Sequence, residues 1–129
     1  MDIGYELAEY IQTNFSYTIG TDLFVGTMPT GVEKGVFILR TGGRLNNYLP
    51  ITKTVLDVYY KDTSASTAIA NIESLKRFMH RMIDTETTNS IIYTILVLGD
   101  IEEAGRTIES EQLYKFTVEI THRATATIS

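Results

Sequence analysis

The sequence predicts an α+β domain, in which a mostly antiparallel five-stranded sheet carries an N-terminal helix and one long helix packed on a face. Two segments have apolar residues at the spacing of a helix, and five others have strand-like apolar runs or strict alternation. Turn-rich segments rather than helices join most successive strands, which favours antiparallel pairing. The predicted order of elements is α-β-β-β-α-β-β.

The N-terminal helix is expected over residues 2–14, with Asp2 as its cap. Its apolar stripe follows the helical period and consists of Ile3, Leu7, Tyr10 and Ile11. Three strands are expected next, at residues 23–28, 36–39 and 51–61. The apolar run 36–39 fits a strand covered on both faces.

Leu56, Val58 and Tyr60 share one face of the third strand, where alternate side chains point the same way. Glycine and asparagine pairs make residues 41–50 a long, turn-rich connection before that strand. The second helix is expected over residues 64–83. Its apolar face comprises Ala65, Ala68, Ile69, Ile72, Leu75, Met79, Met82 and Ile83.

Two strands complete the predicted sheet. Residues 91–98 fit a buried strand, and residues 113–123 alternate cleanly, with Tyr114, Phe116, Val118 and Ile120 facing in. Polar loops are expected at residues 84–89 and 99–110. Only the strand–helix–strand step around the second helix is expected to allow a parallel pair.

Length and composition are those of one globular domain spanning residues 1–129, with a loose tail from about residue 124. The chain has no cysteine, which excludes disulfides and thiolate chemistry. The N-terminus is acidic and no apolar run approaches the roughly 20 residues of a membrane span, so neither a signal peptide nor a membrane helix is expected. A net charge of −5 disfavours tight nucleic-acid binding.

No segment has the pattern of a catalytic or cofactor site. His80 stands beside arginines and His122 ends a strand, so neither has a partner at metal-ligand spacing. The acidic segment 99–106 lacks the alternating oxygen ligands and closing glutamate of an EF-hand loop. The glycines of residues 41–44 lead into a strand rather than opening a helix, unlike those of a phosphate-binding loop. We therefore expect no catalytic residues, no cofactor and no metal.

The second helix carries a basic strip formed by Lys76, Arg77 and Arg81, to which His80 contributes weakly. The strip is either a solvated helix face with some pairing to Glu73 or an electrostatic contact with an acidic neighbouring subunit. Phe78 lies about 120° from the apolar stripe, at the roughly 100° per residue of a helix, and is expected to be exposed. A large aromatic side chain in that position is typical of a protein interface.

The chain resembles the tail terminator proteins of long-tailed bacteriophages, a family also described as minor capsid or tail completion proteins. Four segments in the same order carry the resemblance: the N-terminal helix followed by residues 23–29, a strand running into a double glycine at 35–43, a strand at 55–60 followed by a helix, and the acidic segment 99–106 before an alternating final strand. Together these segments span nearly the whole chain.

The resemblance implies a structural virion protein without enzymatic activity or cofactor, located at the junction of tail and neck and assembled in the host cytoplasm. Such proteins form a hexameric ring that caps the tail tube and joins it to the neck connector, and genomic DNA passes through the lumen without specific binding. The residues expected to contact sister subunits, tail tube protein or neck proteins are Arg44, Tyr48, Arg77, Phe78, Arg81, Asp100, Glu102, Glu103 and Arg106.

Two alternatives remain open from the sequence. The chain can be another neck or tail component, such as a stopper or a tube subunit. It can also be a small-ligand-binding or enzymatic α+β domain, because a fold class by itself does not determine function.

Overall fold

The computed structural model describes residues 3–27, 34–45, 52–80, 83–86, 90–106 and 112–124. Their elements, in chain order, are α1 (Ile3–Asn14), β1 (Leu23–Val25), β2 (Gly35–Leu45), β3 (Thr52–Asp62), α2 (Ala65–His80), β4 (Ile83–Glu86), β5 (Ser90–Arg106) and β6 (Gln112–Ala124). The predicted α+β class, the order of the two helices and the main strands, and the mostly antiparallel pairing are confirmed. The expected tail beyond residue 124 lies outside the described residues.

The strands form one sheet in the order β1-β2-β3-β6-β5-β4. All neighbouring pairs are antiparallel except β1 and β2, which run parallel. The prediction that a parallel pair can arise only around the second helix is therefore wrong. Gly26 follows β1 with a positive φ of 80°, and its N–H donates to the carbonyl of Ile38.

β4 lies where the sequence predicts the end of a helix and a polar loop. It pairs with the start of β5, with Ile83 opposite Thr94 and Thr85 opposite Ile92. The sheet therefore has a short sixth strand in addition to the five predicted. An edge strand has a neighbour on one side only, and polar residues are common there, so the sequence pattern of this strand resembles that of a loop.

Two segments predicted as connections are strands instead. β2 continues through Gly42, Gly43 and Arg44, and β5 continues through the acidic residues as far as Arg106. Their partners β3 and β6 are long enough to supply hydrogen bonds along these extensions. Irregularities in register after Arg40 and Leu98 accommodate the glycines, as β-bulges commonly do.

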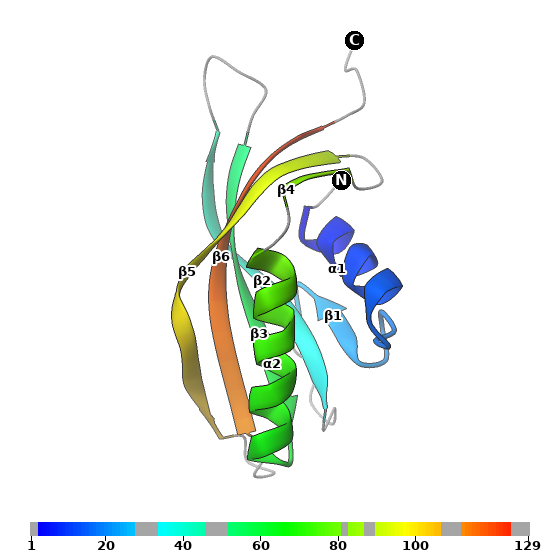
Figure 1. The fold of residues 1–129 in the computed structure, drawn as a ribbon, viewed down its shortest axis with the longest axis vertical. Helices are drawn as coiled ribbons and strands as arrows, with labels where there is room; N and C mark the ends of the chain where they lie inside the picture. Colours follow the sequence, from blue (N-terminus) through cyan, green and yellow to red (C-terminus); the bar gives the residue numbers. More distant parts are fainter. Residues whose placement is uncertain are drawn as a thin grey trace.

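Figure 1 shows α1 and α2 on the same side of the curved sheet, with α2 lying across β3, β6 and β5 and α1 lying beside β1. The predicted inward sides of β3 and β6 are confirmed, because Leu56, Val58, Phe116, Val118 and Ile120 are all buried in one core. From the helices this core receives Ile3, Leu7, Ala8, Ile11, Ala68, Ile72, Leu75 and Met79.

The run at the start of β2 is buried on both faces, as predicted. Val36 and Ile38 point to the helix side and belong to the main core, while Phe37 points to the opposite side. There the Phe37 ring stacks on Phe24, with 5.5 Å between ring centroids, and the ammonium group of Lys61 lies 5.5 Å from its centre. These contacts bury Phe37 although neither helix lies on that face.

α2 begins after Ser64, whose hydroxyl accepts a hydrogen bond from the backbone N–H of Thr67. Such a cap satisfies one of the backbone donors that the first helical turn leaves unpaired. Asp62 supports the same turn by accepting from the backbone N–H of Ser64 at 3.0 Å. These contacts start the helix where β3 ends and place it across the sheet.

A partly buried polar cluster joins the segment that follows α1 to β3 and α2. The Tyr60 hydroxyl donates to Asp62 and accepts from the Asn71 amide at 2.7 Å. Tyr17 packs edge-on against Tyr60, and the two hydroxyls share a hydrogen bond. Burial raises the pKa of both tyrosines, and the neighbouring Tyr60 raises that of Tyr17 further.

This cluster predicts that stability declines in alkali. A raised pKa means that the folded chain holds the Tyr17 proton more tightly than the unfolded chain does, so the stabilisation is fully present below the ordinary tyrosine pKa of 10.0 and is lost as the pH rises above that value. We expect Tyr17→Phe to flatten the decline of unfolding free energy above pH 10.0, measured by urea titration. Tyr5→Phe changes an exposed residue on α1 and is the matched control. Equal slopes for Tyr17→Phe and the native chain would contradict the assignment.

Candidate assembly interface

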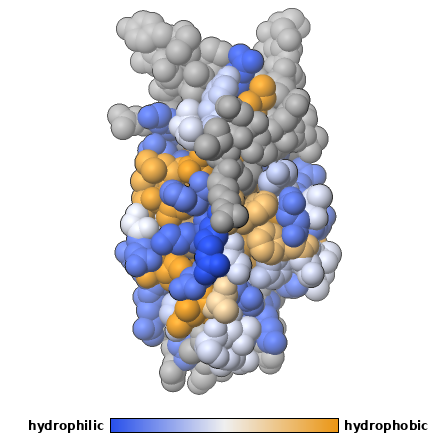
Figure 2. All heavy atoms as spheres, viewed as in Figure 1, coloured by the Kyte–Doolittle hydropathy of each residue, from blue (hydrophilic) through white to orange (hydrophobic). Residues whose placement is uncertain are grey.

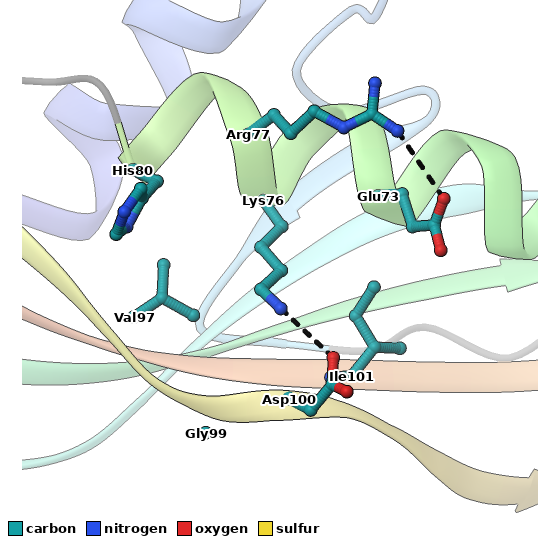
Figure 3. Close-up of a pocket in the computed structure, with 8 residues that line it drawn as sticks. All are labelled: Glu73, Lys76, Arg77, His80, Val97, Gly99, Asp100 and Ile101. Carbon is teal, nitrogen blue, oxygen red and sulfur yellow. Dashed lines mark hydrogen bonds and ion pairs between the residues drawn. The ribbon is translucent and has the colours of Figure 1, made fainter.

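A groove of about 630 Å³ runs between α2 and β5. Figure 3 shows α2 supplying charged side chains to one wall, while β5 forms the opposite side. The lining residues are Glu73, Lys76, Arg77, His80, Val97, Gly99, Asp100 and Ile101. Val97 and Ile101 are half-buried and pack on the core, so the groove has an apolar floor beneath charged walls.

Two ion pairs lie in this groove. The Lys76 ammonium is 3.0 Å from a carboxylate oxygen of Asp100, which ties α2 to β5, and the Arg77 guanidinium lies 3.6 Å from Glu73 on the same helix. The backbone N–H of Ile101 also donates to Asp100, and this bond, followed by Lys76, lowers the pKa of the Asp100 carboxyl. Exposed pairs of this kind contribute little to stability, so their partners can be exchanged for those of another molecule at little cost.

The groove brings together two residues predicted as interface residues, Arg77 and Asp100. Arg77 is strongly exposed, with 72% of its side chain accessible. Glu102 and Glu103 follow on β5 and are also exposed, and Glu102 lies 3.9 Å from the Lys115 ammonium of β6. The acidic segment is thus a strand whose carboxylates are accessible at the surface, rather than the loop predicted from the sequence.

For four predicted interface residues, the side chain or the whole residue lies outside the described part of the structure. Arg44 lies in β2 and Arg106 ends β5, but their side chains are outside the described part of the structure. Tyr48 and Arg81 lie outside the described residues altogether.

Phe78 is not the exposed aromatic residue that the helical pattern predicts. Its ring stacks on Tyr10 at 5.6 Å and meets Phe15 edge-on at 5.0 Å, so it is partly buried between the helices. The angle of Phe78 on an isolated helix was correct, but α1 covers that side of α2. Phe78 therefore helps to hold the two helices together, and its role at an interface stays a prediction.

The two histidines occupy different surroundings. His80 is exposed at the groove, and the His122 ring nitrogen Nε2 lies 2.8 Å from the Thr54 hydroxyl. Burial lowers the pKa of His122, and the nearby Arg40 acts in the same direction while Glu6 opposes it. Among the described residues, no group of three or more histidine, aspartate or glutamate side chains is placed to hold a metal ion.

A second surface, on the opposite face of the sheet, is not evident from the sequence pattern. Ile95 is buried and Val97 packs on the core, so the alternating Leu96 and Leu98 point away from the helices. They are 52% and 41% exposed. The apolar sequence of residues 91–98 predicted a buried strand, but in the described part of the chain the helices cover only one of its faces. We call the surface formed by Val55, Leu96, Leu98, Thr117 and Glu119 the bare sheet face.

Cross-strand register defines this surface. Leu96 lies opposite Glu119, which lies opposite Val55, and Leu98 lies opposite Thr117 in the next row. Asp57 continues that second row and accepts a 2.6 Å hydrogen bond from the Thr117 hydroxyl. Asp57 is only 9% exposed, so Glu119 supplies the accessible carboxylate of these two rows, and Lys115 lies on the same face in the row beyond Thr117.

The helix side has an exposed apolar residue of its own. Ile69 was predicted on the buried stripe of α2 but is 40% exposed. It lies four residues before Glu73 and seven before Lys76, on the flank of α2 that borders the groove. We call Ile69, Glu73, Lys76, Arg77 and His80 the helix flank. Figure 2 shows the hydrophilic surface of α2 beside hydrophobic residues toward the edge formed by β5.

β5 also presents an open edge. β4 pairs with it only as far as Thr94, and beyond that point no strand in the described part of the chain pairs with the outer side of β5 (Figure 1). Unpaired strand edges offer backbone donors and acceptors to other chains. The exposed leucines and the groove thus lie along one accessible strand.

Neither described helix has the length and apolar character needed to cross a membrane. Comparison with protein-family models and with curated proteins finds no match to the chain.

Proposed function

We propose that this protein is a structural subunit of a bacteriophage particle, which forms a ring on the end of the tail tube and joins the tube to the neck connector. The observation that carries the proposal is the placement of two accessible surfaces on opposite sides of the molecule, the helix flank on one side and the bare sheet face on the other. The resemblance of the chain to tail terminator proteins adds to it.

Surfaces on opposite sides favour a ring over a simple pair. When one surface of a subunit binds a different surface of the next, the contact is heterologous and repeats until the rotation closes the assembly. A twofold dimer would instead use the same surface on both subunits. The chain also has a net charge of −5, which suits a channel through which DNA slides without being held by its phosphates.

The direct test is assembly on the tube. We expect the full chain, added to polymerising tail tube protein from the same genome, to stop growth and to leave one ring at one end of each tube in electron micrographs. Mass photometry of the chain alone measures how much of the ring forms without the tube. Tubes that grow to the same lengths with and without the chain, and that carry no added ring, would overturn the proposal.

The same micrographs separate a terminator from other tail components. A tube subunit would repeat along the whole tail, and a stopper would bind the connector without shortening tubes. Only a terminator appears once per tube and limits its length.

One observation favours a ligand-binding function: the volume of the groove lies within the range of small-molecule sites. Such sites are mostly apolar and bury the greater part of the ligand. Here exposed ion pairs form the walls, and their charges are already satisfied by one another. The groove therefore fits a protein contact better than an enclosed ligand.

A further inference from the structure

We infer that acid loosens α1 from the sheet through His122, a histidine on the helix side of β6 that lies close to Glu6 of α1. This response is a property of the folded chain and does not depend on the proposed ring. A cluster of polar side chains from four elements, α1, β2, β3 and β6, produces it.

The register of the sheet places His122 on the helix side. It alternates along β6 with the buried Ile120 and Val118, and Thr54 alternates in the same way with Leu56 on β3. The His122 ring nitrogen Nε2 lies 2.8 Å from the Thr54 hydroxyl. His122 is half-buried and Thr54 is fully buried, so water does not reach the threonine side of this hydrogen bond.

Glu6 brings α1 into the same cluster. It lies in the first turn of the helix and is 0% exposed, although it carries a carboxylate. Ile3 and Leu7 of that helix share one core with Ile92, which lies opposite His122 on β5. The Glu6 carboxylate is near enough to His122 to act on its charge. The position of α1 and the charge of His122 are therefore linked.

A second proton on the His122 ring is unfavourable in these surroundings. The neutral ring can accept the Thr54 hydroxyl proton at Nε2, whereas the protonated ring can only donate there. The hydroxyl proton then needs another acceptor inside a buried site, which costs free energy. Burial lowers the pKa of His122 below its ordinary value, Glu6 opposes this effect, and Arg40 of β2 adds to it.

The direction of the pH effect follows from that lowered pKa. The unfolded chain takes up the proton near the ordinary histidine value of 6.5, and the folded chain does so only at lower pH. The stabilisation is therefore fully present above pH 6.5 and is lost as the pH falls below it. The neighbours of His122 across the strands, Thr52 and Ile92, carry no charge that offsets this loss.

The loss should appear first in α1. β3 and β6 are each hydrogen-bonded to a strand on both sides, whereas α1 is held against the sheet by its side chains. Elements with fewer connections open at lower free energy than the centre of a sheet.

Hydrogen exchange of backbone amides in the full chain tests this response. We expect the protection of α1, corrected for intrinsic exchange at each pH, to fall about threefold or more between pH 6.5 and about one unit below it, and that of β3 to fall less. Ordinary carboxylates titrate near pH ~4, so this window reports on histidine.

Three variants assign the effect. His122→Gln removes the titrating ring and should make the protection of α1 independent of pH in this window. His80→Gln is the matched control and should respond to acid as the native chain does, because His80 is exposed and is the only other histidine. Arg40→Gln changes an exposed residue and removes a charge that lowers the pKa of His122, so it should reduce the loss in acid.

NMR titration of the His122 ring measures the same property directly, with an expected midpoint below 6.5 that rises in Arg40→Gln. A midpoint at or above 6.5, or an acid loss in α1 that persists in His122→Gln, would overturn the inference. If His122→Gln does not fold, Arg40→Gln decides, since an acid loss equal to that of the native chain rules out His122 as the cause. No tail tube enters these measurements, so their failure leaves the proposed function standing.

Discussion

Replacing Phe116 with alanine should lower the free energy of unfolding by about 3–5 kcal/mol, the range typical of a fully buried phenylalanine. Phe116 is 1% exposed on β6, between β3 and β5, and it lies opposite Val58 in the core. Removing the ring leaves a cavity beneath α2 that neighbouring strands, held by hydrogen bonds on both sides, cannot collapse to fill. Urea denaturation followed by circular dichroism measures the loss.

Leu96→Ala on the adjacent strand is the matched control for this prediction. Its side chain is 52% exposed on the other face, so we expect a change within about 0.5 kcal/mol. The same variant should nevertheless weaken association if the bare sheet face is an interface. A large loss of monomer stability for Leu96→Ala would mean that the leucine is buried within its own subunit, contrary to the structure.

Phe78→Ala should lower the free energy of unfolding by about 2–3 kcal/mol, somewhat less than for a fully buried ring because Phe78 is only partly covered. The lost contacts are those with Tyr10 and Phe15, which hold α1 and the segment after it against α2. We therefore also expect the substitution to raise the rate at which the backbone amides of α1 exchange with solvent, and to raise it more than for the amides of β3 and β6.

Arg77→Ala, one residue earlier in α2, serves as the comparison. Its guanidinium is exposed and makes only a long ion pair with Glu73, so the monomer should keep its stability within about 0.5 kcal/mol. If Phe78→Ala lowered the free energy of unfolding as little as Arg77→Ala does, and left amide exchange in α1 unchanged, the aromatic cluster would not anchor α1 to α2.

The candidate interface was only partly predictable from the sequence. Arg77 and Asp100 were identified because charged side chains at the surface of a helix and in a polar segment are visible in the pattern, and the structure brings both to the groove. Phe78 was expected to be exposed but is partly buried, because a helical wheel describes one helix and contains no information about α1. The exposure of Leu96 and Leu98 was not predicted, because a continuous apolar run is the same sequence pattern whether the strand is covered on one face or on both.

The lengths of the strands were also only partly predictable. Residues 41–45 and 99–106 contain glycines and charges that favour turns in isolation, and local propensity alone places them in loops. In the structure they continue β2 and β5 because β3 and β6 run alongside and satisfy their backbone hydrogen bonds. Tertiary pairing outweighs local preference at such positions.

The sequence by itself determined the α+β class, the positions of both helices and the inward faces of β3 and β6, because apolar periodicity reports which side of an element must leave water. Only the tertiary structure decided that β1 and β2 run parallel, that α1 covers Phe78 and that neither described helix covers the face bearing Leu96 and Leu98. These features depend on which elements become neighbours in space. The free energy of packing the whole chain determines which elements become neighbours. Because segments far apart in the sequence contribute to it together, a local sequence pattern does not contain this information.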